Sequence, residues 1–322
     1  MPNPIVRQLL LSLKFSLVAG EILNLLAPVS QMTFSRRLLL LAAMLFHLSA
    51  GLCQGADVLV VADSRLKPVV EMVSGIGKTL KTPLKIYSPA QVKDALQGIA
   101  AREHAKVVVA LGREAIAEAL RLPASVLVIY GLVVTPPVVD RANTTGFYMA
   151  TPAGEYAELI GSHLRALSRI AVLGGRDQLS LLARGESALF TNYTVRSSFE
   201  FVATLKQLNG ADAILLLPDA AVMTATAIEE AYLLSFRKNI PLLGISEKNV
   251  KDGALCALVV DPVHVGKQMG EYATRALKGA NIGQLPASPP GKFDLFVNLD
   301  TARKMGIRLP DELLRGAKRT FP

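Results

Sequence analysis

Past residue 56, short runs of β-branched and aliphatic residues alternate with segments whose apolar positions repeat at helical spacing. The first run, residues 57–62, predicts a strand, and the apolar positions between 69 and 80 predict an amphipathic helix after it. The same alternation predicts strands at 85–87, 106–111 and 125–130 and helices at 89–103 and 114–120. Continuous apolar strands between helices are typical of a parallel sheet that is covered on both faces.

A break at residues 136–143, which opens with two prolines, interrupts this alternation. A strand at 146–150 then begins a second series of the same kind. This series has strands at 170–173, 189–195, 213–217, 241–245, 255–260 and 294–298, and helices at 153–167, 197–208, 222–236, 263–277, 301–305 and from Pro310 onward. Two such series predict the α/β class, with two Rossmann-like lobes built on parallel sheets.

Neither series closes at the break, so we expect the chain to cross between the lobes more than once through a multi-crossing hinge. The first lobe is predicted to hold residues 57–145 together with about 260–285. The second is predicted to hold residues 146–258 together with about 290–322, with the final strand and helix near the hinge.

The N-terminal part resembles an export signal. Arg36 and Arg37 precede the apolar run 38–46, and small residues follow it. This run is shorter than the roughly 20 residues of a membrane-spanning helix. We expect residues 32–56 to be a signal peptide cut near Gly55 or Ala56, so that the mature protein opens at Asp57 in the periplasm.

Residues 1–31 are predicted to be an upstream segment that is not translated if synthesis starts at Met32. The alternative is a long basic leader or a membrane-associated helix. Cys53 leaves with the signal, and Leu52 before it does not fit a lipoprotein signal. The remaining thiol, Cys256, stands in an apolar run and is expected to be buried and inert, without a disulfide.

Composition and charge exclude several classes of protein. Apolar residues make up 51% of the chain and charged residues 19%, which fits a well-packed globular protein. The net charge of +9 is compatible with nucleic-acid binding, but the basic residues are scattered. The longest basic stretch, Arg315–Arg319, is expected to end a helix. We therefore predict no nucleic-acid partner. We also expect the protein to be a monomer.

Enzymatic motifs are absent from the sequence. It has no GxGxxG, GxxxxGK[ST], GxSxG or HExxH pattern, and its four histidines lack the spacing of metal ligands. The sequence therefore predicts that the protein is not an enzyme and that it has neither cofactor nor metal.

Candidate ligand-binding residues follow the predicted strands, because ligands of open parallel sheets bind beyond the carboxyl ends of the strands. The expected ligand-binding residues are Ser64, Gly112, Arg113, Tyr130, Thr151, Asp219, Ser246 and Asp261. The alternative for Ser64, Asp219, Ser246 and Asp261 is that each only caps the helix after it. The alternative for Arg113 is a solvated side chain at the start of a helix.

Several segments resemble one known family. They are Leu215–Asp219, Asn239–Glu247, Val250–Leu255, Val260–Gln268 and Phe296–Gly306. Together, from about residue 143 to residue 314, they are similar to ABC transporter substrate-binding proteins, some of which take aromatic amino acids. The resemblance implies a type I periplasmic-binding-protein-like fold. It also implies two lobes that close on a small molecule, an amino acid or related metabolite, and a membrane permease as the partner.

The resemblance thins before residue 143, in segments that form the ligand pocket in the family. Gly112-Arg113-Glu114 replaces a turn of small residues, and 131–136 replaces an acidic turn. The sequence therefore does not specify the identity of the ligand. The main alternative function is an exported sensory binding protein of the same fold that signals to a membrane receptor. Two others are an enzyme that uses Asp219 or Asp261 and a sugar-responsive repressor core.

Overall fold

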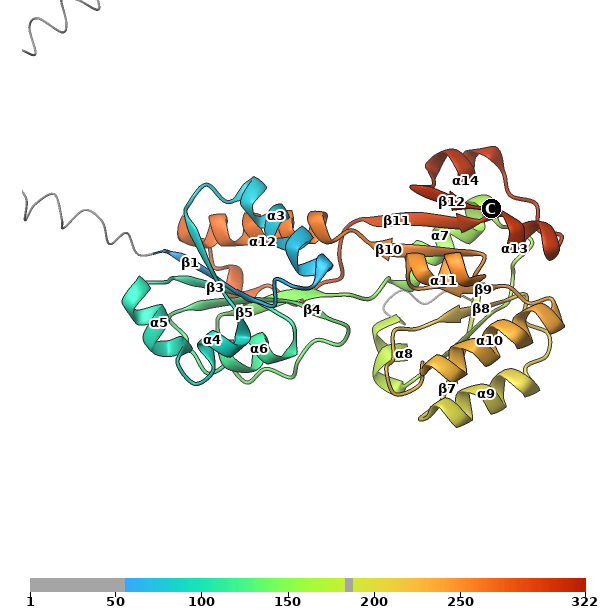
Figure 1. Ribbon diagram of the computed structural model, residues 1–322, viewed down its shortest axis with the longest axis horizontal. Coiled ribbons are helices and arrows are strands. Elements are labelled where there is room, and N and C mark those ends of the chain that lie inside the picture. Colours follow the sequence, from blue (N-terminus) through green and yellow to red (C-terminus); the bar gives the residue numbers. More distant parts are fainter. Residues whose placement is uncertain (1–55, 183–187) are drawn as a thin grey trace, which may run out of the picture. The chain divides into compact units, whose positions relative to one another are not determined.

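The computed structural model describes residues 56–182 and 188–322, and the predicted signal peptide up to residue 55 lies outside them. The described strands form two sheets, one of five strands in the order β2-β1-β3-β4-β5 and one of seven in the order β12-β11-β10-β9-β8-β6-β7 (Figure 1). Among them, only β10 and β11 pair antiparallel. The predicted α/β class with two mostly parallel sheets is thereby confirmed.

The first sheet and its helices come from the first predicted series together with one strand, β5, and one helix, α12, of the second. Its strands are β1 (Val58–Ala62), β2 (Leu84–Tyr87), β3 (Val107–Leu111), β4 (Leu127–Val133) and β5 (Thr144–Tyr148), and its helices are α3 (Lys67–Thr79), α4 (Pro89–Val92), α5 (Leu96–Glu103), α6 (Arg113–Ala119) and α12 (Pro262–Leu277). The strand expected to open the second series is β5, which pairs with β4 in the first sheet. The single helix expected at 89–103 is two helices, because Asp94 between them has a φ of 56°.

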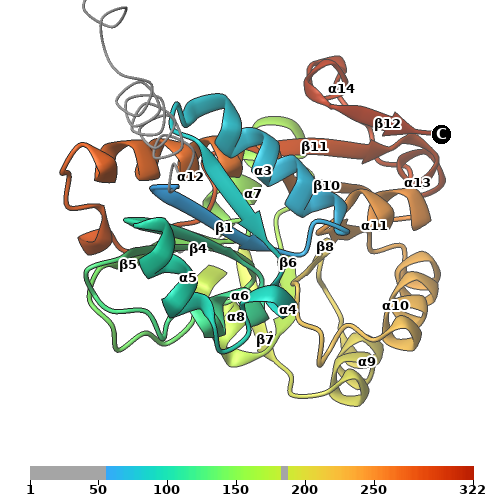
Figure 2. The same cartoon turned by 60° about the vertical axis from the view of Figure 1, so that its left-hand side comes forward.

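Alternate residues of the first-sheet strands face opposite sides, as the two-residue repeat of a strand requires. Val58, Val60 and Ala62 of β1 face α3 and α12, whereas Leu59 and Val61 face the side of α4, α5 and α6. Figures 1 and 2 show α3 and α12 together on one face of this sheet. Because both faces are covered by helices, the inner strands β1 and β3 are apolar and buried at every position, whereas the edge strand β2 carries the polar Lys85.

A short 3-10 helix, η3 (Ile282–Gln284), packs against the first sheet, and the remaining strands form the second. Its strands are β6 (Ile170–Gly174), β7 (Phe190–Thr194), β8 (Ala213–Leu216), β9 (Leu242–Gly244), β10 (Cys256–Val260), β11 (Phe293–Asn298) and β12 (Arg319–Phe321), and its helices are α7 (Ala153–His163), α8 (Arg176–Leu182), α9 (Ser198–Gln207), α10 (Ala225–Lys238), α11 (Glu247–Asp252), α13 (Leu299–Lys304) and α14 (Asp311–Gly316). Cys256 is buried, as predicted, and burial raises the pKa of its thiol to about 12.

The basic stretch Arg315–Arg319 ends a helix as predicted, because α14 stops at Gly316 with Arg315 in its last turn. The strand that follows was not predicted: residues 319–321 form β12, which pairs with β11. Phe321 lies in a small apolar cluster on this sheet together with Val250, Ala257 and Phe296. A buried aromatic side chain stabilises a short edge strand that local sequence does not predict.

The chain passes three times between the two sheets. It leaves β5 for α7 through residues 149–152, returns after β10 through Asp261 into α12, and leaves again after residue 288, which bridges to Phe147 of β5. This confirms the multi-crossing hinge. Among the described residues, no helix is both long and apolar enough to cross a membrane.

Candidate functional site

A pocket opens at the carboxyl edge of the second sheet, where parallel α/β sheets bind ligands. It lies next to the first two crossings of the chain, and its cavity volume is about 50 Å³. It is lined by Met149, Ala150, Thr151, Tyr156, Gln178, Leu182, Leu216, Leu217, Pro218, Ile245, Leu258 and Val260. Most of these side chains are aliphatic, and none is charged.

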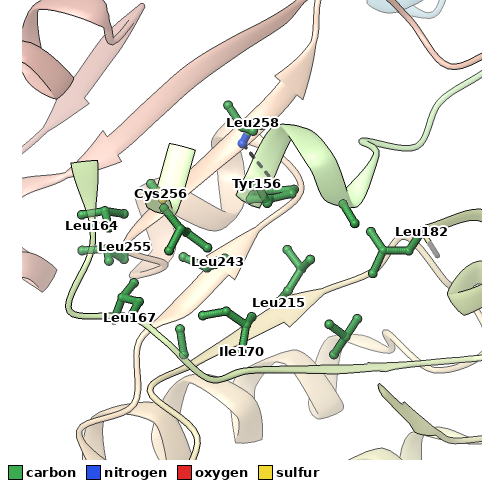
Figure 3. Close-up of a cluster of buried hydrophobic side chains, with 14 of the residues drawn as sticks. Tyr156, Leu164, Leu167, Ile170, Leu182, Leu215, Leu243, Leu255, Cys256 and Leu258 are labelled. Carbon is green, nitrogen blue, oxygen red and sulfur yellow. Dashed lines mark hydrogen bonds between the residues drawn. The ribbon is translucent and has the colours of Figure 1, made fainter. Parts of the chain in front are cut away.

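Tyr156 on α7 shapes the base of the pocket. Its hydroxyl donates to the Gly244 carbonyl at 2.8 Å. It also accepts from the Leu258 amide at 3.3 Å, as Figure 3 shows, so that it links the end of β9 to the middle of β10. Burial raises the pKa of this phenol above its ordinary value. Because both hydrogen bonds of the hydroxyl are used within the protein, Tyr156 supports the pocket wall and presents its ring rather than its polar end.

Two side chains bring polar groups to the pocket. The Thr151 hydroxyl donates to the Leu258 carbonyl at 3.2 Å, and it can still accept a hydrogen bond. The Gln178 side-chain amide donates to the Thr135 hydroxyl at 2.7 Å. The side-chain carbonyl of Gln178 has no hydrogen bond within residues 56–182 and 188–322, and so it is free to accept one from a ligand. The pocket thus combines aliphatic walls with two neutral hydrogen-bonding groups.

Of the eight predicted residues, Thr151 alone lines this pocket. Asp219 lies next to Pro218 at its rim. One carboxylate oxygen accepts from the Gly175 amide at 3.2 Å and the other from the Ala221 amide at 3.0 Å. The alternative that Asp219 caps the following helix is wrong, because α10 begins at Ala225 and is capped by Thr224. Asp219 instead joins the chain after β6 to the turn after β8.

Ser246 and Asp261 do cap helices. The Ser246 hydroxyl accepts from the Asn249 amide at 3.1 Å at the start of α11. Asp261 accepts from the Val263 amide at 2.9 Å and the His264 amide at 3.1 Å at the start of α12. The capping interpretation therefore accounts for both side chains, and their contact with a ligand stays a prediction.

The predicted residues of the first sheet lie apart from this pocket. Ser64 is exposed in the turn after β1 and caps no helix, since the residue before α3 is Leu66. Gly112 precedes α6 with a φ of 93°, and its amide donates to the Gly131 carbonyl at 2.9 Å. Arg113, the first residue of α6, is exposed, and its side chain has no polar partner within the described part of the chain.

Tyr130 lies within β4 and not in a loop. It is 3% exposed and belongs to the apolar cluster between the first sheet and α4, α5 and α6. Its ring lies so close to Gly146 of β5 that a Cβ there would be 2.4 Å from it. Burial, and then the neighbouring Tyr148, raises the pKa of its phenol. The structure therefore places Tyr130 in the apolar core. The prediction was that this residue, at the end of an apolar strand, would face the ligand.

Sequence reasoning missed Gln178 and the apolar lining. None of the eight predicted residues comes from the segment after β6 or from α8, which contains Gln178. The aliphatic residues carried no signal, because a pocket wall and a core use the same side chains. Among the residues that the structure describes, no group of three or more His, Cys, Asp or Glu side chains is arranged to hold a metal.

Comparison with known proteins identifies the relatives of this chain. The model of a family described as ABC transporter substrate binding protein matches residues 179–321. The tyrosine-binding protein of Clostridioides difficile is 24% identical over 159 residues, which make up 49% of this chain and 44% of that protein. The alignment therefore spans less than half of that relative. These matches confirm the resemblance that the motifs between residues 215 and 306 indicated.

Solved structures share the fold. The ligand-free, open structure of a substrate-binding protein with adhesive properties from Clostridium difficile has a TM-score of 0.62 at 13% identity, over 82% of this chain and 98% of that one. The ABC domain from Streptococcus pneumonia in complex with L-Trp has a TM-score of 0.54 at 19% identity, over 82% of this chain and 100% of that one. These similarities confirm the predicted periplasmic-binding-protein-like fold.

Proposed function

We propose that this chain is the solute-binding component of an ABC-type importer. The observation that carries the proposal is the uncharged, mostly aliphatic pocket at the carboxyl edge of the second sheet, beside two of the crossings between the sheets. A ligand seated there lies where two parallel sheets present their loops, which is the binding position of open α/β folds. No enzymatic step, cofactor or nucleic-acid partner forms part of the proposal.

The ligand class that the pocket lining favours is an amino acid with an apolar or aromatic side chain. The aliphatic walls suit such a side chain, and Thr151 and Gln178 offer neutral hydrogen bonds to its polar atoms. The tyrosine-binding relative and the L-Trp complex support this class of ligand. Arg113, exposed at the carboxyl edge of the first sheet, is proposed to bind the ligand carboxylate with its two-pronged guanidinium.

Binding is coupled to closure in this proposal. A ligand held by groups from both sheets favours the closed state by its higher affinity for that state. The closed monomer then docks on a membrane permease. This function implies a mature protein in the periplasm, and the signal-like residues 32–56 support that location. We assign residues 57–148 with 262–288 to one lobe and 153–260 with 293–322 to the other.

A ligand screen tests the function. The protein purified after export is screened by thermal shift against the proteinogenic amino acids and related metabolites, and each hit is measured by calorimetry. An aromatic or aliphatic amino acid is expected to raise the melting temperature, because a ligand that binds only the native state stabilises it. If no amino acid binds, or if only sugars do, the proposed ligand class is wrong.

Substitution of Arg113 separates binding from folding. Arg113→Ala and Arg113→Lys should each weaken binding of the amino acid by about 10- to 100-fold, the range expected for a lost hydrogen bond to a charged group. The melting temperature without ligand should not change, since the side chain is exposed. Arg102→Ala, an exposed arginine on α5, is the matched control and should leave affinity unchanged. Unchanged affinity in Arg113→Ala would remove Arg113 from the site.

A further inference from the structure

Glu103, the last residue of α5, has a buried carboxylate beside the first sheet. The residue is 8% exposed, and three hydrogen-bond donors reach its side chain. The Lys85 ammonium lies 2.5 Å from one oxygen, the Tyr87 hydroxyl 3.3 Å from the other, and the backbone amide of Ala56 also donates to it. These hydrogen bonds, that of Lys85 first, hold the pKa of Glu103 below its ordinary value. The carboxylate is therefore ionised and directed at the start of the described chain.

Ala56 is part of the folded core. It is 1% exposed, two residues before β1, in the apolar cluster that also contains Leu59 and Val61. The residues before it in the sequence are Cys53, Gln54 and Gly55. Export signals are cut after small residues at alternating positions. The two positions are the last residue before the cut and the third-last. A cut before Ala56 puts Gly55 and Cys53 there, whereas a cut after Ala56 would put the long side chain of Gln54 in the third-last position.

We propose that the mature chain begins at Ala56 and that Glu103 binds the new α-ammonium. Cleavage is a hydrolysis: water adds across the Gly55–Ala56 peptide bond, Gly55 keeps the new carboxylate, and the released amine of Ala56 takes up a proton. The peptidase that catalyses it is of the membrane-bound kind that removes export signals. The proposal moves the end of the signal peptide from residue 56 to residue 55.

The structure gives this boundary a physical consequence. In the precursor, Ala56 offers Glu103 one neutral N–H group, whereas after cleavage the same nitrogen carries a positive charge. Charge-assisted hydrogen bonds are stronger than neutral ones, above all next to a carboxylate that is largely removed from water. The side chain of Glu103 is 10% exposed, and Lys85 is the cation that already pairs with it. Processing therefore adds a contact that anchors the start of β1.

Removal of one more residue would destroy this arrangement. A chain that begins at Asp57 lacks the buried methyl group of Ala56, and its ammonium would be one residue away from the carboxylate. Asp57 already has other partners, since its carbonyl accepts from the Lys106 and Val107 amides and its side chain pairs with Lys106 at 3.1 Å. The geometry therefore favours Ala56 over Asp57 as the first residue.

The first experiment determines the mature terminus. The full chain is expressed in a bacterial host, and the exported product is studied by N-terminal sequencing and intact mass. Ala56 as the first residue is the expected result. Asp57 as the first residue, or a product that keeps residue 55, would overturn the proposal. This result depends on export, which is part of the proposed function, but it does not depend on ligand binding, so failure of one leaves the other standing.

The second experiment tests the ion pair in the processed protein. The rate at which an amine-selective acylating reagent modifies the α-amino group is measured against pH, with the modified terminus identified by peptide mass. The half-titration point should lie above the unperturbed value of about 8 in the wild type and fall toward about 8 in Glu103→Gln. Glu114→Gln, an exposed carboxylate on α6, is the matched control and should titrate like the wild type.

Identical titration of the wild type and Glu103→Gln would show that Glu103 does not bind the ammonium. If Glu103→Gln does not fold, Glu103→Asp provides the same comparison, because it keeps the charge but shortens the side chain by one methylene group. Its titration point should lie between that of the wild type and about 8. A point equal to the wild-type value would contradict the close contact that the proposal requires.

Discussion

Two aspartates of the second sheet show how carboxylates fix the ends of its strands. Asp212, just before β8, accepts from the amides of Ser168 and Arg169 at 3.0 and 2.9 Å and from the Arg169 guanidinium at 2.9 Å. Asp219, just after the same strand, holds the amides of Gly175 and Ala221. Both therefore connect β8 to the neighbouring strand β6, one at each edge of the sheet.

Asp212 predicts a specific dependence of stability on pH. Its hydrogen bond from Arg169 is the main cause that lowers the pKa of its carboxyl from 3.8 to about 2. A depressed pKa stabilises the fold above the unfolded value of 3.8, and this contribution is lost as the pH falls through about 2. Because the Arg169 side chain is 66% exposed, the contribution is discounted to about 1 kcal/mol.

Denaturation by urea between pH 6 and pH 2 checks this prediction. The free energy of unfolding of Asp212→Asn should be about 1 kcal/mol below that of the wild type at pH 6, and the difference should vanish toward pH 2. Glu229→Gln, an exposed carboxylate on α10, should show no such difference. A difference that grows as the pH falls would have the wrong sign for a depressed pKa.

Asp219 is predicted to act on stability through its two backbone hydrogen bonds. Asp219→Ala leaves the amides of Gly175 and Ala221 without this partner and should lower the free energy of unfolding by about 1–2 kcal/mol. Affinity for the ligand should fall as well if the carboxylate contacts a ligand ammonium. Urea denaturation and calorimetry on the same variant distinguish the two roles, with Glu229→Ala expected to stay within about 0.5 kcal/mol of the wild type.

At the scale of elements, the packing of α3 on α12 depends on close approach of the two backbones. A Cβ atom added at Gly266 would lie 2.0 Å from the Met72 carbonyl oxygen, and one at Gly75 would lie 2.2 Å from that of Val263. A Cβ at Gly270 would lie 2.2 Å from the Thr79 side-chain oxygen and 2.8 Å from the Ile76 carbonyl oxygen. These glycines bring together two helices that are far apart in the sequence, and they thereby attach the segment after the second crossing to the first sheet.

Gly266→Ala should therefore destabilise the protein by more than about 2 kcal/mol, because the obstacle is backbone that cannot move aside as a side chain can. Gly77→Ala, on the exposed side of the same helix α3, is the matched control. It has no atom within 4 Å of the added Cβ and should stabilise the protein by about 0.5–1 kcal/mol. Thermal or urea unfolding compares the two. Equal effects would mean that the helices separate without cost.

At the scale of the whole molecule, three crossings connect two sheets that each have their own apolar clusters on both faces. Such an architecture permits the sheets to move as bodies while each core stays intact. Under the proposed function, a saturating ligand should lower the radius of gyration measured by small-angle X-ray scattering. An unchanged radius of gyration at saturation, together with binding seen by calorimetry, would contradict closure.

The sequence alone was sufficient for the fold class and for most elements. Strands such as β1 and β3 are apolar at every position, so the covering of both faces follows from composition along a single strand. Capping of α11 and α12 is also local, because Ser246 and Asp261 bond to amides two or three residues later. The motifs between residues 215 and 306 pointed to the family for the same reason, since they are continuous segments.

Tertiary structure decided which sheet a strand joins, where the pocket lies and which polar groups remain free. The sequence of residues 144–148 does not show that β5 pairs with β4, because strand pairing depends on a partner elsewhere in the chain. From the sequence, Asp219 could be a helix cap. In the structure, its carboxylate instead accepts a hydrogen bond from the Gly175 amide, which lies after a different strand. The pocket is lined by aliphatic residues that are identical in kind to core residues, and only the packing of α7 and α8 at the sheet edge leaves space between them.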